Sequence, residues 1–367
     1  MQIALTKKLA DATGIKPGKV SPAADPLFSW TANWTRVWAN RKAEDMLVLV
    51  NNATRFTVAV YEVKRKDLKN VPDMMLGAIK NTLLALNLNP EIVDEYMQTA
   101  GEVEFAVNRN RQYTAWVNRA GTDCAFYVGG KYNGVSKLFC DTAGAWINHR
   151  LIGYSNNPND SFKPLDKMFD ALANLTGKPV YLYRAFELTV TLDLAIYKAV
   201  RRLIVAADIK LGDLHEVLQS VFRWENCHLH DWKVFAGKSR NPAVRLVMSE
   251  EDLAYDEKAI LEKDHKLSEY FPKYKYILYT YDMGDNWEHL IKLARVIDGH
   301  DAPSPYLLEA VGQTPPEDVG GVGGYIDFRE IMLNPNHEDY SEIKQWAGYW
   351  RPELGEWESS PRLINSP

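Results

Sequence analysis

The sequence is poor in cysteine and has no long hydrophobic run. Its three cysteines, Cys124, Cys140 and Cys227, are a low, odd number without the spacing of a disulfide scaffold. They form no Cys-x-x-Cys pair, which excludes a zinc ribbon and a thioredoxin-type redox site. No segment approaches the roughly 18 uninterrupted apolar residues of a membrane helix. Charge at Lys7 interrupts the start of the chain before a signal-peptide core can form. We therefore expect a soluble, cytoplasmic protein without a membrane partner.

An excess of charge of one sign is also missing. The 367 residues carry 43 Lys and Arg against 48 Asp and Glu, a formal net charge of −5. Such a chain has no general attraction to nucleic acid, so binding nucleic acid would need a local basic patch. The hydrophobic share of 46% is typical of a globular protein and excludes intrinsic disorder.

The length predicts about two domains, since domains average roughly 150 residues. The breaker cluster Thr176-Gly177-Lys178-Pro179 places the boundary near residues 176–180. We predict an N-terminal domain over 1–176, a C-terminal domain over 181–350 and a poorly ordered tail over 351–367. The fold class is α+β, each domain being a mixed or antiparallel sheet with packed helices.

Periodicity predicts the individual elements. Met46–Val50 and Phe56–Tyr61 are β-rich runs joined by a turn-like segment, which is typical of a hairpin. In the second half we predict strands at 181–192, 201–206, 228–236, 243–248, 275–281 and 287–296, and helices at 211–222, 324–333 and 338–348. The Pro- and Gly-rich segment 299–324 is predicted to be a long functional or packed loop.

Four sequence blocks follow one another in the second half: Ala207–His215, Trp224–His230, Tyr281–His289 and Pro315–Gly321, closed by Gly324-Tyr325. This ordered series closely resembles the plasmid pRiA4b ORF-3-like family over residues 181–348. Members of that family occur in bacterial plasmids and transposons and are often labelled resolvase or integrase passengers. The resemblance therefore implies a mobile-element accessory protein, and it implies no mechanism.

This chain departs from the family at two places. The family often has cysteines where Thr314 and Val319 stand, so a metal or redox role of those positions is not available here. Lys210 replaces the usual Thr or Ser before the first helix of the domain and lacks the side-chain oxygen of an N-cap. Residues 3–175 resemble, more weakly, an uncharacterised bacterial domain family that implies nothing catalytic.

Histidine, carboxylate, tryptophan and glycine residues concentrate in the four blocks and are the candidates for a binding cleft. They are His215, Trp224, His228, His230, Asp282, Asp285, Trp287, His289, Glu317, Asp318, Gly320 and Gly321. No catalytic residue and no cofactor is identified among them.

A divalent metal is one use of these residues. His228 and His230 alternate on a predicted strand, which puts both imidazoles on one face and Cys227 and Asp231 on the other. With His289 and Asp285 they form the candidate ligand set for zinc or manganese, or for a general acid and base. The alternative is structural: the histidines hydrogen-bond within the sheet, and the carboxylates hold turns and loops.

Several sharper assignments are excluded. The Gly320–Gly324 run is neither a dinucleotide fingerprint nor a P-loop, and its glycines favour a conformational role. No histidine is followed by arginine three residues later, so the His-x-x-Arg box of a tyrosine recombinase is missing. No arginine-surrounded serine is recognisable around Ser21 or Ser29, as a serine resolvase would require.

Basic residues interleave with aromatic ones at three places. These are Arg201-Arg202, Asn108–Arg111 with Tyr113 and Trp116, and Lys273–Tyr276. Such segments bind nucleic acid in some proteins and form solvated strand edges in others.

Two functions therefore stay open. The first is a binding or regulatory module for nucleic acid or a protein partner, acting through the C-terminal domain. The alternative is a metal-dependent hydrolase or nuclease that uses the His/Asp cluster.

Overall fold

The computed structural model describes residues 1–19, 21, 24–39, 42–61, 63–131, 147–153, 161–237, 240–256, 258–348, 350–351 and 358–364. The chain divides into two units, Met1–Leu182 and Tyr183–Pro367, and each is described by itself. Cys140 and most of the predicted turn at 155–161 lie outside the described residues. Within the described part, no helix is long and apolar enough to cross a membrane.

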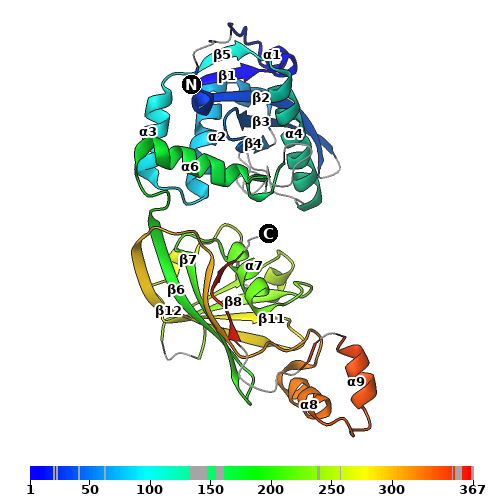
Figure 1. The fold of residues 1–367 in the computed structure, drawn as a ribbon. Helices are drawn as coiled ribbons and strands as arrows, with labels where there is room; N and C mark the ends of the chain where they lie inside the picture. Colours follow the sequence, from blue (N-terminus) through cyan, green and yellow to red (C-terminus); the bar gives the residue numbers. More distant parts are fainter. Residues whose placement is uncertain are drawn as a thin grey trace. The chain divides into compact units, whose positions relative to one another are not determined.

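The first unit is built on a five-stranded mixed sheet in the order β4-β3-β2-β1-β5 (Figure 1). Its strands are β1 (Gln2–Leu5), β2 (Ser29–Ala39), β3 (Lys42–Asn51), β4 (Thr57–Tyr61) and β5 (Glu104–Val107). β1 runs parallel to β2 and β5, whereas β2, β3 and β4 form an antiparallel meander. The predicted hairpin is confirmed as β3 and β4.

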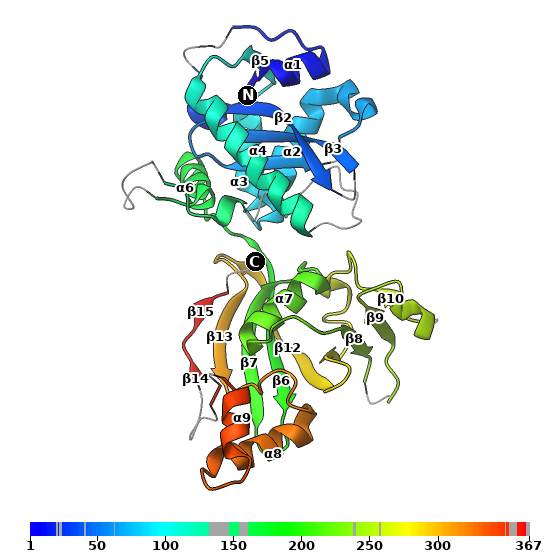
Figure 2. The same ribbon diagram turned by 90° about the vertical axis from the view of Figure 1, so that its right-hand side faces the viewer.

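Helices cover both faces of this sheet (Figures 1 and 2). They are α1 (Lys7–Thr13), α2 (Val71–Ala85), α3 (Pro90–Ala100), α4 (Arg111–Lys131) and α6 (Pro164–Thr176), with short 3-10 turns at η1 (Pro26–Phe28) and η2 (Arg65–Asn70). Leu47 and Leu49 pack with α2, α3 and α6, while Met46, Val48 and Val50 pack with α4. Because both faces are dry, β3 is apolar at successive positions.

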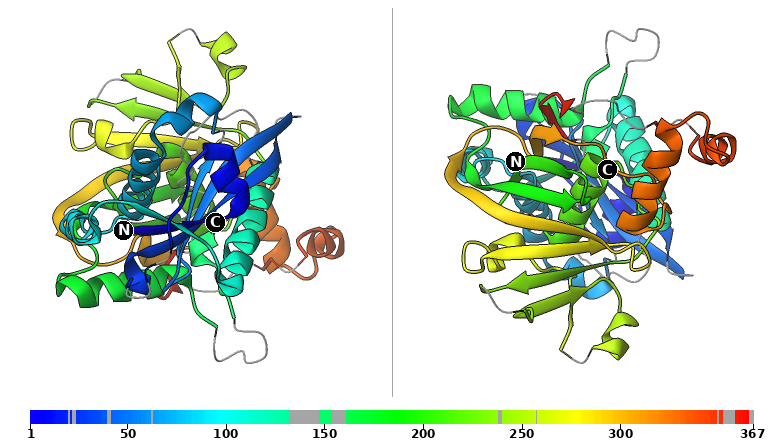
Figure 3. Two further views of the ribbon diagram at one scale, coloured as in Figure 1. Left: turned by 90° about the horizontal axis from the view of Figure 1, so that it is seen from above. Right: turned by 90° about the horizontal axis from the view of Figure 1, so that it is seen from below.

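The second unit contains a ten-stranded sheet in the order β10-β9-β8-β11-β12-β6-β7-β13-β14, with β15 also paired to β13. Its strands are β6 (Tyr183–Asp193), β7 (Lys198–Ala206), β8 (His230–Phe235), β9 (Val244–Val247), β10 (Ile260–Leu261), β11 (Tyr276–Tyr281), β12 (Trp287–His300), β13 (Tyr306–Val311), β14 (Glu358–Ser359) and β15 (Arg362–Leu363). All pairings are antiparallel except that of β9 with β10, and β6 and β12 lie side by side in the view from below (Figure 3, right). The α+β class, with mixed and antiparallel sheets, is confirmed in both halves.

Helix α7 (Leu211–Phe222) supplies the helical side of this core (Figure 2). The predicted apolar stripe is confirmed, since Leu214, Val217, Leu218 and Val221 are all buried against sheet residues. Its N-cap, Lys210, makes no side-chain capping bond, as the departure from the family implies. The remaining helical segments are η4 (Asp252–Tyr255), η5 (Leu267–Glu269), α8 (Gly321–Leu333) and α9 (Tyr340–Trp346).

Two sequence predictions are wrong in this unit. The segment 299–324 is not one loop, because β13 pairs with β7 and buries Leu307 and Ala310. The tail is also not wholly unordered: β14 and β15 pair with β13, and Ile364 is buried in the core. Residues 352–357 and 365–367 of the predicted tail lie outside the described part.

Arg201 on β7 has its guanidinium inside the core of the second unit, with no exposed area. Its Nε donates to the Val221 carbonyl at the end of α7 (2.8 Å), and Nη1 donates to the Gly312 carbonyl beyond β13 (3.0 Å). Nη2 donates to Thr314 Oγ1 (3.0 Å). Burial lowers the pKa of Arg201 to about 10, so the side chain stays charged at neutral pH. One buried cation thus joins the end of a helix to the end of a strand.

We expect Arg201→Met to lower the free energy of unfolding by about 3 kcal/mol, because it leaves buried carbonyl groups without donors. Arg184→Met is the matched control: its ion pair with Asp298 is exposed at both ends, so its loss costs less than about 1 kcal/mol. Urea denaturation of both variants measures the difference. Equal losses would contradict the anchoring role of Arg201.

Candidate functional site

Three connections meet at one place in the second unit. They are residues 223–229 between α7 and β8, residues 282–286 between β11 and β12, and residues 312–320 between β13 and α8. The Asp282 amide donates to the Leu229 carbonyl (2.9 Å), and the Glu225 amide donates to Glu317 Oε1 (2.6 Å). Each connection is therefore tied to another by a direct hydrogen bond.

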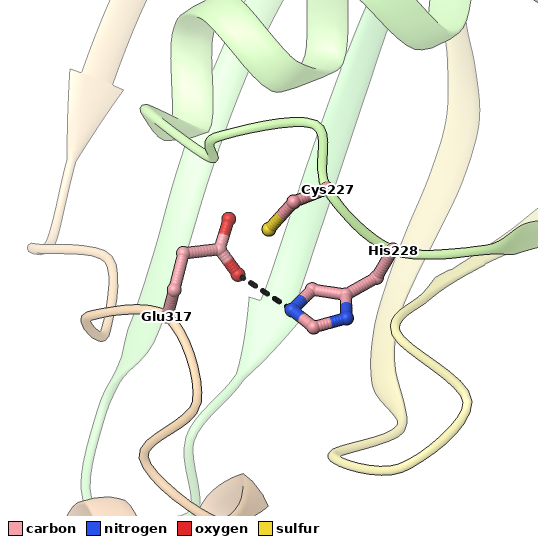
Figure 4. Close-up of side chains that lie close together, drawn as sticks. All are labelled: Cys227, His228 and Glu317. Atoms are coloured by element: carbon pink, nitrogen blue, oxygen red, sulfur yellow. Dashed lines mark ion pairs between the residues drawn. The ribbon is translucent and has the colours of Figure 1, made fainter.

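His228 lies at the centre of this junction (Figure 4). Its Nε2 is 3.1 Å from Asp318 Oδ1, 3.6 Å from Asp282 Oδ2 and 3.8 Å from Glu317 Oε2. The Cys227 thiol also faces this group, and its Sγ, His228 and Glu317 offer ligand atoms within 4.8 Å of one another. We call Cys227, His228, Asp282, Glu317 and Asp318 the His228 cluster.

Glu317 is the most constrained member of the His228 cluster. Its Oε1 accepts hydrogen bonds from the Glu225 amide (2.6 Å) and the Tyr281 hydroxyl (3.1 Å). Its Oε2 is buried, points toward His228 and has no hydrogen-bond partner. The side chain is only 10% exposed, and burial raises the pKa of its carboxyl group.

The His228 cluster carries an excess of negative charge. Among the described residues, Asp282, Glu317 and Asp318 each have His228 as the one ion-pair partner, and neither lysine nor arginine pairs with them. One imidazole has at most one proton on Nε2, so it cannot satisfy three carboxylates. A cation surrounded by these oxygens would compensate the repulsion between them.

The backbone of the junction is shaped by left-handed residues. Asp282 has φ 58°, and its Oδ1 accepts from the Gly284 amide (2.8 Å), which leaves Oδ2 free to face His228. Gly321 has φ 68°, and a Cβ there would lie 2.8 Å from the Asp285 carbonyl oxygen. The glycines therefore have the conformational role expected of them, allowing the 312–320 connection to approach the turn.

His215 and His230 form a separate stacked pair outside the His228 cluster. Their rings stack at 3.8 Å between centroids and 11° between planes. His230 Nε2 bonds Glu262 Oε2 at 3.0 Å. Burial alone would raise the pKa of Glu262, but its bonds with His230 and Trp232 lower it overall.

His215 is held as a neutral imidazole. Its Nε2 lies 2.7 Å from Asn226 Oδ1, whose amide nitrogen donates to Glu216, so Nε2 carries the proton. Its Nδ1 then accepts from the Tyr279 hydroxyl at 2.7 Å. Burial, followed by the charge of His230, lowers the pKa of His215 to about 4.

His289, Trp224 and Trp287 belong to the apolar core. His289 is fully buried on β12 and accepts a hydrogen bond from Trp224 Nε1 (3.2 Å). Burial lowers the pKa of His289 to about 3. Trp224 packs against Trp287 with ring centroids 5.5 Å apart.

The candidate ligand set His228, His230, His289 and Asp285 does not converge. His228 precedes β8 instead of lying on it, so alternation does not place it beside His230. His230 faces Glu262, His289 lies in the core, and Asp285 Oδ2 accepts from the Gly320 amide (3.1 Å). The prediction that Cys227 points away from His228 is also wrong, because the chain there is a loop without strand alternation.

The cleft predicted from the sequence holds Asp282, Glu317 and Asp318 together with His228, whereas the predicted metal-ligand set takes Asp285 as its carboxylate. Their placement in the sequence is a usable signal, because each lies two or three residues before a glycine in a turn-forming block. Strand alternation would place Cys227 on the face opposite His228, but residues 227 and 228 lie in a loop, where this alternation does not apply.

Residues of the basic and aromatic segments of this unit make contacts within the unit. Arg201 is buried, and Arg202 pairs with Glu187 (2.6 Å) and Glu309 (3.1 Å). Lys273 lies over the ring of Tyr274 at 4.8 Å, and Tyr276 stacks on Phe235.

Comparison with known proteins finds two families. The plasmid pRiA4b ORF-3-like protein family matches residues 184–358, and a domain family of unknown function (DUF6933) matches residues 2–167. The chain is 37% identical over 163 residues to the uncharacterized protein y4hQ of Sinorhizobium fredii (strain NBRC 101917 / NGR234), across 44% of this chain and 80% of that protein. It is also similar to a crystal structure of the protein of unknown function MM3350 from Methanosarcina mazei Go1, with 28% identity, a TM-score of 0.42, and coverage of 47% of this chain and 94% of that one. The resemblance seen in the sequence is thereby confirmed for both halves, whereas the association with transposons stays a prediction.

We expect the stability of the protein to fall as the pH decreases from about 6.5 toward 4. His215 has its folded pKa depressed to about 4, while an unfolded imidazole titrates near 6.5, so in this window the unfolded state binds more protons. In His215→Gln the free energy of unfolding should decrease by about 2 kcal/mol less between pH 6.5 and 4.5 than in the unmodified protein. Denaturant titrations at several pH values measure this difference.

His337→Gln is the control, because it removes an imidazole outside the core whose neighbour is Asp339. A pH dependence unchanged by His215→Gln would contradict the assignment of a neutral, buried His215.

Proposed function

The chain belongs, through residues 184–358, to the plasmid pRiA4b ORF-3-like family, and we propose that this domain is a divalent-metal-dependent hydrolase. One observation supports this most directly: oxygens of three carboxylates, from two connections, lie within 3.8 Å of a single imidazole nitrogen. The names of the relatives assign no activity, so the proposal depends on these contacts alone.

His228, Asp282 and Asp318 are the proposed ligands. Their ligand atoms all lie within 4.8 Å of one another, and they come from separate connections of the fold. One imidazole with two carboxylates suits zinc or manganese, and the neighbouring Cys227 thiol favours zinc. Asp318 is 69% exposed, so an ion held here would face solvent and keep a position for a substrate.

Glu317 is the proposed general base. Its Oε1 is fixed by the Glu225 amide and the Tyr281 hydroxyl, which aims the unpartnered Oε2 into the His228 cluster. Burial raises its pKa, which makes the carboxylate a stronger base. A bound divalent ion would supply Lewis-acid polarisation of a substrate oxygen, and Glu317 would accept the proton of the attacking water.

A second candidate is a metal-dependent binding module. Leu229 is 50% exposed and Met283 is 45% exposed, and each directly follows a member of the His228 cluster in sequence. Exposed apolar side chains beside a charged site are typical of a surface that docks a partner. This candidate applies if the ion binds and no substrate is turned over.

We expect the chelator-stripped protein, prepared without a histidine tag, to bind Zn²⁺ with a stoichiometry of one. At a zinc concentration of about 100 times the Kd, binding should add about 2.7 kcal/mol to the free energy of unfolding. His228→Ala should abolish this gain, whereas His337→Ala, which removes a histidine outside the His228 cluster, should keep it. Calorimetric titration and thermal denaturation measure both quantities.

The variant Glu317→Gln tests the role of the general base without removing a proposed metal ligand. Glutamine keeps the acceptor oxygen to which the Glu225 amide and the Tyr281 hydroxyl donate. We expect this variant to retain Zn²⁺ while losing about 10²- to 10⁴-fold in the hydrolysis of bis(p-nitrophenyl) phosphate or p-nitrophenyl acetate. His228→Ala should lose both properties.

The outcomes distinguish the candidates. Zinc binding without turnover of either probe favours the binding module. The absence of Zn²⁺ and Mn²⁺ binding contradicts both candidates and leaves the His228 cluster as a structural junction.

A further inference from the structure

We propose that a cavity in the N-terminal unit binds a small phosphorylated organic molecule of nucleotide or sugar-phosphate size. The cavity has a volume of about 680 Å³, within the range of natural small-molecule sites. It is lined by Gln2, Ala4, Lys19, Asn52, Asn108, Arg109, Asn110, Arg111 and Tyr113. It is independent of the metal site proposed above, since all its lining residues belong to the other unit.

The cavity forms where a helix leaves part of a sheet uncovered. Helix α4 begins at Arg111, shortly after β5, and packs against β2 and β3. The N-terminus, where β1 begins, and helix α4 are both seen in the view from above (Figure 3, left). Ile3 and Leu5 of β1 join the core on the opposite face, so Gln2 and Ala4 are left to line the cavity.

Three cationic side chains, Lys19, Arg109 and Arg111, line the cavity, and the described residues of its lining include no carboxylate. Within the described part of the chain, no ion pair involves Lys19, Arg109 or Arg111. Arg119, further along α4, differs in pairing with Asp123 at 3.2 Å. Like charges around one hollow repel one another, and a phosphate group relieves that repulsion while accepting paired hydrogen bonds from arginine.

Amide groups supply the uncharged polar part of the lining. Asn52 Oδ1 accepts from Thr31 Oγ1 (2.8 Å), which leaves its amide nitrogen available as a donor. Gln2 is half-buried and makes no side-chain hydrogen bond among the described residues. Tyr113 contributes an aromatic ring to the lining, and this ring packs against Trp116 with the ring centroids 5.3 Å apart. Donors, acceptors and a ring face suit the organic part of a ligand.

The same segment, Asn108–Arg111 with Tyr113 and Trp116, was open to nucleic-acid binding on sequence alone. A nucleic-acid surface requires cations along an extended track. Here the cations gather around one cavity, in a chain of net charge −5. This arrangement favours a small ligand over a polymer.

The test is isothermal titration calorimetry on the full chain with EDTA present, which removes any contribution of a metal. The probes are AMP, glucose 6-phosphate, adenosine and inorganic phosphate. We expect AMP or glucose 6-phosphate to bind at least tenfold more tightly than adenosine and than inorganic phosphate. Arg109→Gln/Arg111→Gln should weaken that binding at least tenfold, and Lys19→Gln should weaken it in the same direction. Lys69→Gln, which removes one exposed charge outside the cavity, should change it less than twofold.

Several outcomes overturn the proposal. One is that neither AMP nor glucose 6-phosphate binds at 5 mM, and another is that the arginine variant binds as tightly as the unmodified protein. Equal affinity for inorganic phosphate reduces the site to a simple anion site. Tight binding of a 15-nucleotide single strand, with AMP unable to compete, assigns the surface to nucleic acid instead.

Discussion

The buried guanidinium of Arg201 connects the parts of the C-terminal unit on which the candidate site depends. It donates to the Val221 carbonyl in the last turn of α7, after which the Cys227–His228 connection begins. It also donates to the Gly312 carbonyl and to Thr314 Oγ1, in the connection that contains Glu317 and Asp318. A charge buried among carbonyl dipoles is costly unless each donor finds its acceptor. The geometry of both connections is therefore coupled to one side chain on β7.

The histidines of this unit differ in burial, and burial decides which of them stay neutral within the core. His289 and His215 have strongly lowered pKa values because burial disfavours the charged imidazole, and both serve the core as neutral hydrogen-bonding rings. His228 instead lies at a partly exposed junction among carboxylates. A group of carboxylates without lysine or arginine partners works against folding, and such local conflict is typical of functional sites.

The two units carry opposite electrostatic character in their candidate sites. The His228 cluster gathers carboxylates and a thiol, which suits a cation. The cavity beside β1 gathers arginine and lysine without a carboxylate, which suits an anion. The nearly balanced net charge of the chain conceals both, because composition averages over sites of opposite sign.

Local sequence patterns are enough to predict many of the helices and strands, the α+β class and the family of each half. The stripe of α7 and the β3–β4 hairpin depend on near neighbours in the chain, so periodicity predicts them. Strand β13 was not predicted, because its pairing with β7 joins residues about a hundred positions apart. Prolines on both sides of β13 also favour a loop. The contacts of the site depend on the tertiary structure. His228 and His230 are two residues apart, but β8 begins at His230, so His228 in the preceding loop faces Asp318 whereas His230 faces Glu262. Which side chains meet depends on where strands begin and how loops cross, and these are fixed by contacts distant in sequence.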